Sequence, residues 1–145
     1  MNKNKKWCTI ISYHYVRNLS SSAYPKIKGL DSSAFQDQLD YFQKYYEFIT
    51  IEDCLDAIYS NKNIPTNSLL LTFDDGYIDH YNVVFPILKE RGIQGCFFPP
   101  GKAIRESKVL DVNKIHFILA KINNVNSLIE DIFLLMDKYK LDYEL

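Results

Sequence analysis

Two adjacent carboxylates, Asp74 and Asp75, are the residues of this 145-residue sequence whose types and spacing could do chemistry. They follow a short apolar run and precede Gly76. Like charges this close repel, and a metal ion on one carboxylate relieves the repulsion while the other stays free to accept a proton. A divalent metal lowers the pKa of bound water from roughly 15.7 to about 7, which permits amide hydrolysis at neutral pH. One carboxylate could therefore hold a metal while the other takes the proton of the bound water.

The same residues permit a plainer interpretation. Asp and Gly favour turns regardless of chemistry, so residues 74–76 could form only the turn after a core strand. A calcium-binding loop is excluded, because the spaced acids and the terminal Glu that it needs are absent. A phosphotransferase with a nucleophilic aspartate fits poorly, because its pattern would place a second acid where Gly76 stands.

The elements that must position the acids alternate between strands and helices. Strands are predicted at residues 7–13, 48–49, 68–73 and 93–98. Helices are predicted from residue 31 or 32 to 46, from 50 to 60, from 86 to 91, from 111 to 122 and from 127 to 139. Residues 15–30 are expected to form a long loop. In the second helix we expect a capping box of Thr50 and Asp53, and an inner side formed by Leu55, Ile58 and Tyr59.

This alternation favours an α/β fold with parallel strands, because parallel neighbours need a crossover connection that is normally helical. The acids then lie at the carboxyl end of the third strand. An α/β barrel or an open sheet is expected. Four strands cannot close a barrel that needs about seven or eight, so an exposed sheet edge suited to self-association is also predicted.

The run LLLTFDDGY at residues 69–77 resembles the first signature motif of the polysaccharide deacetylase family, also called the NodB-homology or carbohydrate esterase 4 family. The resemblance extends through VFPILK (84–89), RGI (91–93) and GCFF (95–98), and back to YHYV (13–16). It implies a partial, deformed (β/α) barrel. Residues 7–101 would form the N-terminal part of the NodB-homology domain, and residues 102–145 a helical insertion or tail of an incomplete domain.

The resemblance also implies roles for single residues. Asp75 would bind a divalent metal, zinc first and cobalt or nickel as alternatives, and Asp74 would be the catalytic base. The backbone N–H of Tyr77 would bind the oxyanion, and the reaction would remove acetyl groups from an N-acetylated polysaccharide or oligosaccharide. Tyr77, Tyr81 and Tyr24 are candidates for stacking on a sugar, while core packing accounts for most of the eleven tyrosines.

The family completes its metal site with a His-Ser/Thr-x-x-His pair, which this sequence lacks. Its three histidines are His14, His80 and His116, and Ala120 stands four residues beyond the last of them. We expect His116 to be a helix histidine with its hydrogen bonds satisfied, and His80 to cap a helix or lie on the surface. His14 follows the first strand, which places it on the same rim as the acids, either in the substrate site or with only a local hydrogen bond.

The missing histidines leave three hypotheses open, and whether this chain is itself an enzyme stays open with them. The first is a shortened deacetylase. The second is a catalytically inactive remnant that binds glycan or a protein partner. In the third, the exposed sheet edge pairs with a second chain that supplies the histidines.

Composition excludes several other classes. A net charge of −1 gives no basic field for nucleic acid or anionic lipid. Cys8, Cys54 and Cys96 are odd in number and widely spaced, which favours a reducing compartment over a disulfide framework. No apolar run approaches the roughly 18 residues of a membrane span, and the basic residues 1–6 are not followed by the apolar run of a signal peptide. A cytoplasmic protein is expected.

Overall fold

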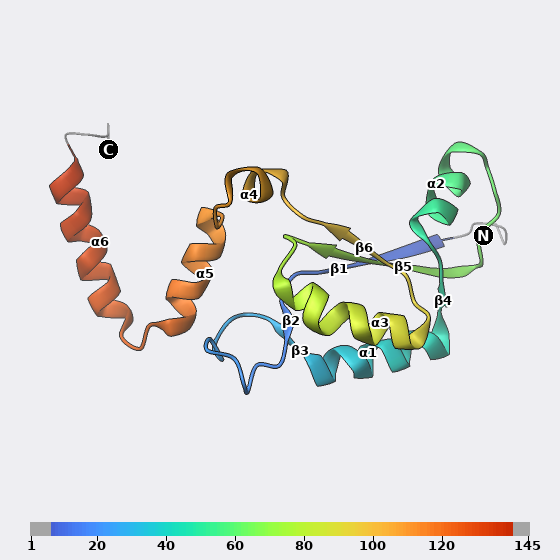
Figure 1. Cartoon of the computed structure of the whole chain (residues 1–145), viewed down its shortest axis with the longest axis horizontal. Coiled ribbons are helices and arrows are strands. Elements are labelled where there is room, and N and C mark those ends of the chain that lie inside the picture. The colour runs from blue at the N-terminus through green and yellow to red at the C-terminus, as the bar shows by residue number, and fades with distance from the viewer. Residues whose placement is uncertain (1–6, 141–145) are drawn as a thin grey trace, which may run out of the picture.

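The computed structural model describes residues 7–140 and shows an α/β body from which two helices extend (Figure 1). The body is built on a four-stranded parallel sheet. Its strands are β1 (Trp7–Tyr13), β4 (Glu47–Phe48), β5 (Asn67–Asp74) and β6 (Gly95–Phe98). β5 lies at the centre: β1 pairs with its whole length, from Trp7 opposite Asn67 to Tyr13 opposite Phe73, while β4 and β6 pair with successive parts of it. The prediction of parallel strands is confirmed.

Six α-helices and one π-helix complete the described part of the chain. They are α1 (Ser32–Tyr45), α2 (Ile51–Tyr59), the π-helix η1 (His80–Val84), α3 (Phe85–Arg91), α4 (Gly101–Glu106), α5 (Asp111–Lys121) and α6 (Val125–Tyr139). The predicted capping box of Thr50 and Asp53 is present on α2. Asp31 caps α1, and Gly92 ends α3 with a left-handed φ of 65°.

Several short elements were not predicted. The expected long loop begins and ends in two-residue strands, β2 (Val16–Arg17) and β3 (Leu30–Asp31), which pair in parallel as a second small sheet. The π-helix and α4 were also missed. Segments of two to six residues span too few positions to show a period of two or of 3.6 residues, so local sequence patterns do not reveal them.

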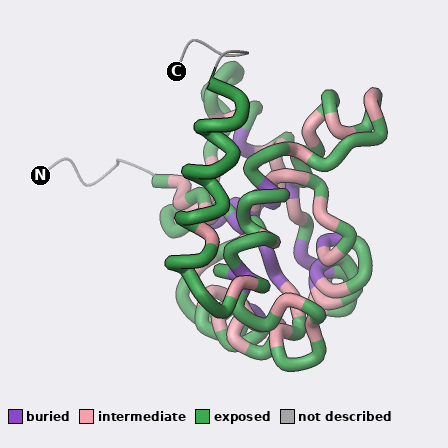
Figure 2. Tube along the Cα trace, turned by 90° about the vertical axis from the view of Figure 1, so that its left-hand side faces the viewer, coloured by how far each residue is buried: buried purple, intermediate pink, exposed green. Residues whose placement is uncertain are grey.

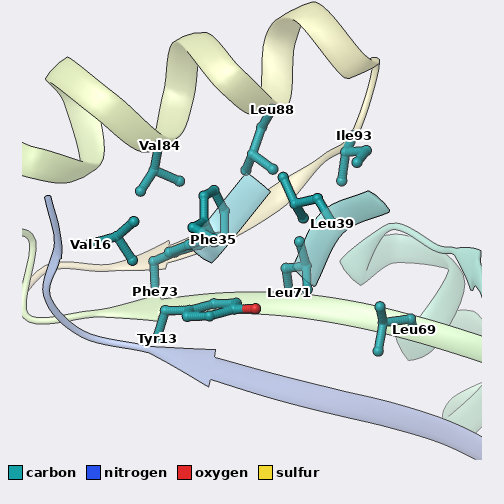
Figure 3. Close-up of a cluster of buried hydrophobic side chains, with 10 residues drawn as sticks. All are labelled: Tyr13, Val16, Phe35, Leu39, Leu69, Leu71, Phe73, Val84, Leu88 and Ile93. Carbon is teal, nitrogen blue, oxygen red and sulfur yellow. The ribbon is translucent and has the colours of Figure 1, made fainter. Parts of the chain in front are cut away.

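The main core lies between the sheet and the helices α1 and α3 (Figure 3). Alternate residues of β5 point into it, and so do apolar residues of both helices. Its buried members are Tyr13, Val16, Phe35, Leu39, Leu69, Leu71, Phe73, Val84, Leu88 and Ile93. The hydroxyl of Tyr13 donates to Gln38 Oε1 at 2.7 Å, and burial raises the pKa of this tyrosine to about 12. This core fixes α1 and α3 on one face of the sheet.

The opposite face is covered less completely. Here α2 packs through Ile51 and Cys54 against Leu70 and Cys96. The expectation that Leu55, Ile58 and Tyr59 form the inner side of α2 is wrong: these side chains are 43%, 64% and 80% exposed. The residues of α2 that pack against the sheet, Ile51 and Cys54, lie in its first turn.

Three cysteines far apart in the sequence come together on this face. Cys8 of β1 is packed against the cluster that contains Cys54 and Cys96, and all three are free thiols. Burial, followed by the proximity of Cys54, raises the pKa of Cys8; burial is also the main cause of the raised pKa of Cys96. These thiols therefore behave as small apolar side chains.

Residues 7–140 form an open sheet. Each of β1 and β6 has one edge that pairs with no other described strand, so the α/β class is confirmed and a closed barrel is not seen.

Two residues of α5, Asn113 and Ala120, are buried, whereas α6 has no buried residue and is exposed over most of its length (Figure 2). The division at residues 101 and 102 stays a prediction. None of the described helices is both long enough and apolar enough to cross a membrane.

The two faces of the sheet differ in how completely helices cover them. Alanine substitutions of one leucine in α1 and one in α2 test this difference. Leu39→Ala should lower the free energy of unfolding by about 2–5 kcal/mol, because Leu39 is fully buried and a cavity would remain. Leu55→Ala should cost much less, because this side chain is 43% exposed. Urea denaturation measures both, and equal losses would contradict the placement of α2.

Candidate active site

Asp74 is the last residue of β5, at the carboxyl end of the central strand. Its Oδ2 accepts a hydrogen bond of 2.8 Å from the Ser12 hydroxyl of β1. The register explains this contact: Ser12 lies opposite Thr72, so the side chains of Ser12 and Asp74 are diagonal neighbours on one face of the sheet. A neutral donor thus steadies one oxygen of a carboxylate that stays partly exposed.

The chain turns sharply directly after Asp74. Asp75 and Gly76 both adopt left-handed φ values, 73° and 60°, and the Asp75 amide donates to the Phe98 carbonyl at the end of β6 at 3.2 Å. Asp is among the few non-glycine residues that tolerate this conformation. A Cβ on Gly76 would lie 2.7 Å from Pro99 Cβ, so the turn also needs glycine for space. The run is therefore a turn, as its composition predicts, and this turn separates the two carboxylates.

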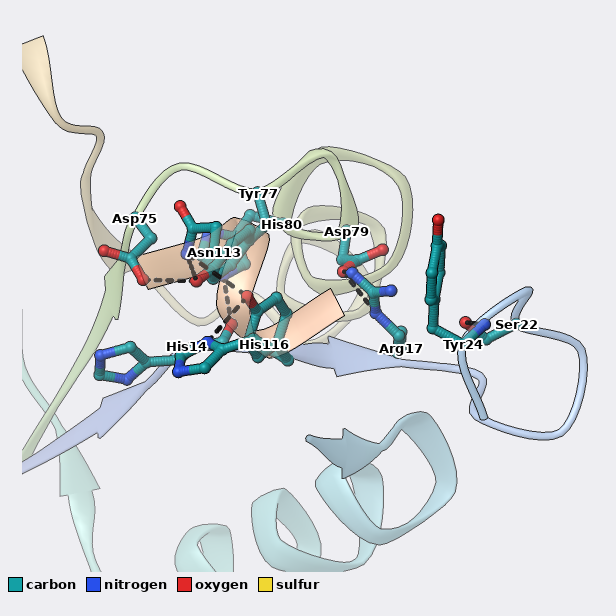
Figure 4. Close-up of polar contacts among 11 residues, drawn as sticks. His14, Arg17, Ser22, Tyr24, Asp75, Tyr77, Asp79, His80, Asn113 and His116 are labelled. Atoms are coloured by element: carbon teal, nitrogen blue, oxygen red, sulfur yellow. Dashed lines mark hydrogen bonds and ion pairs between the residues drawn. The ribbon is translucent and has the colours of Figure 1, made fainter. Parts of the chain in front are cut away.

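Asp75 is held by a chain of partly buried polar groups (Figure 4). Its Oδ2 accepts from the Tyr77 hydroxyl at 2.5 Å, and that hydroxyl accepts from Asn113 Nδ2 at 2.7 Å. The Tyr15 ring stacks on the Tyr77 ring with centroids 4.0 Å apart. Burial first, and the hydrogen bond to Asp75 second, raise the pKa of Tyr77 above its ordinary value. Tyr77 therefore keeps its proton and acts as a donor to Asp75.

The three histidines take different places around this chain of contacts. His14 follows β1 directly and its side chain is exposed; Figure 4 shows its ring at the same end of the network as the Asp75 carboxylate. His116 lies on α5 with Nδ1 3.2 Å from the Tyr15 hydroxyl, which confirms the prediction of a hydrogen-bonded helix histidine.

The expectation that His80 caps a helix or lies on the surface is wrong. His80 is 4% exposed, and its Nε2 lies 2.7 Å from the His14 carbonyl oxygen. The π-helix turns the ring inward against Phe73 and Phe97, where it anchors the connection after β1. Its Nδ1 has no hydrogen-bond partner among the described residues.

The three tyrosines proposed for sugar stacking differ in how far their rings are open to solvent. Tyr77 is already stacked on Tyr15, and Tyr24 packs against Phe117 at 4.7 Å. Tyr81 is 71% exposed and borders a cavity of about 230 Å³ beside Gly76. Of the three, Tyr81 has the most open ring. Pro99, which follows β6, also lines this cavity.

Sequence reasoning missed several side chains of the site. Ser12, Tyr15 and Asn113 each contact the motif across dozens of residues; Asn113 and Tyr77, for example, are 36 positions apart. Arg17 and Asp79, which form a partly buried ion pair at the start of the π-helix, were missed for the same reason. No local pattern marks such contacts, because they depend on which elements the fold brings together.

Whether the residues at this rim could hold a metal depends on the number and type of possible ligands. Asp75 and His14 are ligands of suitable type at this rim. A catalytic zinc site needs three protein ligands and an open water position. Within residues 7–140 no group of three or more His, Cys, Asp or Glu side chains is placed to hold a metal ion. The described residues alone therefore do not complete a zinc site.

Comparison with known proteins identifies the class. The family model described as polysaccharide deacetylase matches residues 61–133, about half of the chain. This chain belongs to the polysaccharide deacetylase family, as the motif predicts.

Individual relatives agree. YxkH of Bacillus subtilis (strain 168) is 28% identical over 96 residues, which cover 66% of this chain and 32% of YxkH. The poly-beta-1,6-N-acetyl-D-glucosamine N-deacetylase of Escherichia coli (strain K12) is 32% identical over 80 residues, which cover 54% of this chain and 12% of that protein. The chain thus spans a third or less of the length of these two relatives.

Solved structures share the fold. IcaB from Ammonifex degensii superposes with a TM-score of 0.52 and 32% identity, covering 65% of this chain and 39% of IcaB. The Streptococcus pyogenes deacetylase PplD, solved in complex with acetate, superposes with a TM-score of 0.56 and 24% identity, covering 74% of this chain and 49% of PplD.

Alanine substitutions at Gly76 and Gly92, which have similar φ values, can distinguish the cost of backbone strain from the cost of steric overlap with Pro99. Gly92→Ala should cost roughly 1–2 kcal/mol, because φ is 65° and nothing lies within 4 Å of the added Cβ. Gly76→Ala should cost a further 1–3 kcal/mol, roughly, because its Cβ would overlap Pro99. Chemical denaturation of both variants measures the difference. Equal costs would show that Pro99 does not confine the turn.

Proposed function

We propose that this chain carries the acid pair of a metal-dependent hydrolase that removes acetyl groups from an N-acetylated polysaccharide or oligosaccharide. One observation carries the proposal: Asp74 ends the central strand, Asp75 begins the turn that follows, and each carboxylate is held by a different partner. Membership of the polysaccharide deacetylase family supports it. So does the similarity to a protein described as a poly-beta-1,6-N-acetyl-D-glucosamine N-deacetylase.

Asp74 is the proposed general base. Ser12 donates to its Oδ2, and the carboxylate is partly exposed at the rim where a substrate can approach. In the proposed reaction a water oxygen attacks the acetyl carbonyl carbon while Asp74 accepts a water proton. The carbon–nitrogen bond then breaks, the departing amine takes up the proton that Asp74 accepted, and acetate and a free amino sugar result.

The backbone N–H of Tyr77 is the proposed oxyanion donor. Support comes from the turn, because successive backbone N–H groups in a tight turn can form a concavity that binds anions. Such a donor stabilises the negative oxygen that develops when water adds to the carbonyl. The left-handed φ values of Asp75 and Gly76 define this turn.

Asp75 is the proposed metal ligand, with zinc as the first choice and cobalt or nickel as alternatives. When bound, the metal would lower the pKa of a water molecule and polarise the acetyl carbonyl. Because residues 7–140 do not complete such a site, we propose that further ligands come from a second polypeptide, which in the purified protein is a second copy of this chain. An unpaired edge of the sheet, on β1 or on β6, is where such polypeptide could pair.

A second candidate function is glycan binding without turnover. The incomplete ligand set favours it, and so does the cavity beside Gly76, which is lined by Tyr77, Tyr81, Phe85 and Phe97. Aromatic rings of this kind offer flat apolar faces to a sugar. The two candidates use the same rim and differ only in whether acetate is released.

The assay that separates them uses the purified chain with zinc, cobalt or nickel and an acetylated chitooligosaccharide. The deacetylase proposal expects acetate release, lowered at least about 100-fold by Asp74→Asn, because a positioned general base contributes at least that factor. Asp137→Asn is the matched control, since Asp137 is exposed on α6 and undergoes the same change of charge. Circular dichroism checks that both variants fold.

Two outcomes would contradict the deacetylase proposal for this chain. Glycan binding detected by calorimetry, without acetate release under any of the three metals, would support the second candidate. Turnover that persists in Asp74→Asn would show that Asp74 is not the base.

A further inference from the structure

We propose that α6 is a dimerisation helix, whose apolar stripe packs antiparallel against the same stripe of a second copy of this chain. The inference does not rest on the proposed function, because α6 contributes no residue to the candidate active site. It gives a role to a helix that has no buried residue (Figure 2).

The residues of α6 repeat with the period of a helix that packs against another helix. Apolar side chains recur at alternating steps of three and four residues, which places them in one stripe along the helix. The stripe consists of Val125, Leu128, Ile132, Leu135 and Tyr139, with Ile129 and Met136 beside it. Glu130 and Asp137 lie on the opposite side, where Asp137 pairs with Lys140 at 2.7 Å. The helix therefore has one apolar side and one charged side.

The stripe is largely open to solvent in the single chain. Ile132 is 45% exposed and Leu135 is 53% exposed. α6 is nevertheless a regular helix of 15 residues, and the Asn124 side chain caps its start by accepting from the Asn126 and Ser127 amides. Most helices in proteins gain their stability from the packing of an apolar face, so an open stripe of this kind marks a contact surface.

The area of the stripe is sufficient for a dimer. Burying a Val, Leu or Ile side chain removes roughly 60–120 Å² from water, so the half-exposed stripe offers on the order of 500 Å² per copy. Two copies together then bury about 1,000 Å², which is the size at which specific interfaces begin. We therefore expect a reversible dimer at micromolar concentrations.

The charges that flank the stripe make it complementary to itself. Asp131 and Lys138 lie on the same side of the stripe, one heptad apart and opposite in sign. The Lys138 ammonium lies 4.9 Å from the centre of the Tyr139 ring, which keeps this charge at the border of the stripe. In an antiparallel pair, a two-fold axis perpendicular to the helices brings Asp131 of each copy toward Lys138 of the other.

This complementarity selects both the occupant and its direction. A second copy supplies both opposite charges by symmetry, whereas any other partner has to bring its own. In a parallel pair, Asp131 would face the Met136 side of the second copy instead of Lys138. The antiparallel dimer is therefore the arrangement that satisfies the stripe and its charges together.

Sedimentation equilibrium of the purified chain measures the dimer directly. Ile132→Glu should raise the dimer dissociation constant at least about 30-fold, because it places a carboxylate in the stripe of both copies. The matched control is Ile58→Glu, which makes the same change at a 64% exposed position on α2 and should leave the constant unchanged. A circular dichroism spectrum like that of the wild type shows that each variant is folded.

Charge reversal tests the antiparallel direction without changing the stripe. Asp131→Lys alone and Lys138→Glu alone should each raise the dissociation constant about 10-fold, because like charges then meet at two symmetry-related places. An equimolar mixture of these two variants should form heterodimers about as tightly as the wild type, since opposite charges meet again. The double variant by itself should also dimerise like the wild type.

Several outcomes would overturn the inference. One is a wild-type chain that stays monomeric throughout the micromolar range. Another is a dimer that Ile132→Glu leaves intact, because a different surface, such as an edge of the sheet, then holds it. Charge variants without effect would exclude the antiparallel pair.

A membrane surface is the competing occupant of an amphipathic helix. α6 contains three acidic residues and one lysine, so it should not bind vesicles of phosphatidylglycerol. Co-sedimentation with such vesicles measures this. A chain that remains monomeric and sediments with the vesicles would contradict the dimer.

Discussion

The parallel pairing of β1 with the whole of β5 is the constraint on which the rest of the structure depends. It places Ser12 diagonally opposite Asp74 and puts His14 at the same rim. On the other side of the sheet it stacks Tyr13 on Phe73 at the centre of the main core. A slip of one residue in this register would turn every side chain of β1 to the opposite face and separate Ser12 from Asp74.

The core and the rim are linked through β5. Leu69, Leu71 and Phe73 point toward α1 and α3, while Leu70, Thr72 and Asp74 alternate with them on the opposite face. The packing of Leu69, Leu71 and Phe73 in the core therefore fixes the position of Asp74 at the end of the same strand. Beyond Asp74 the backbone enters left-handed space, so regular strand pairing stops directly after this carboxylate.

A second constraint is that buried polar groups must be paired. The chain of contacts from Asp75 through Tyr77 and Asn113 meets this requirement with residues from the motif and from α5. Tyr15 extends it to His116. Together with Ala120, which packs in the same region as Tyr15, these contacts tie α5 to the body, whereas α6 has no buried residue.

The sequence by itself determined the class of fold, the main strands and helices, their caps, and the place of Asp74 and Asp75 at the end of the central strand. These features are local: an apolar run, a capping box or a left-handed glycine declares itself within a few residues. The family followed from the same run of residues.

Only the tertiary structure decided which side chains partner the acids and how each histidine is used. His80 is buried because a π-helix turns it under the rim, and Asn113 reaches Tyr77 because α5 packs against Tyr15. Leu55, Ile58 and Tyr59 are exposed because α2 packs against the sheet through Ile51 and Cys54. Each of these facts depends on contacts between distant segments, and such contacts leave no period or spacing in the chain itself.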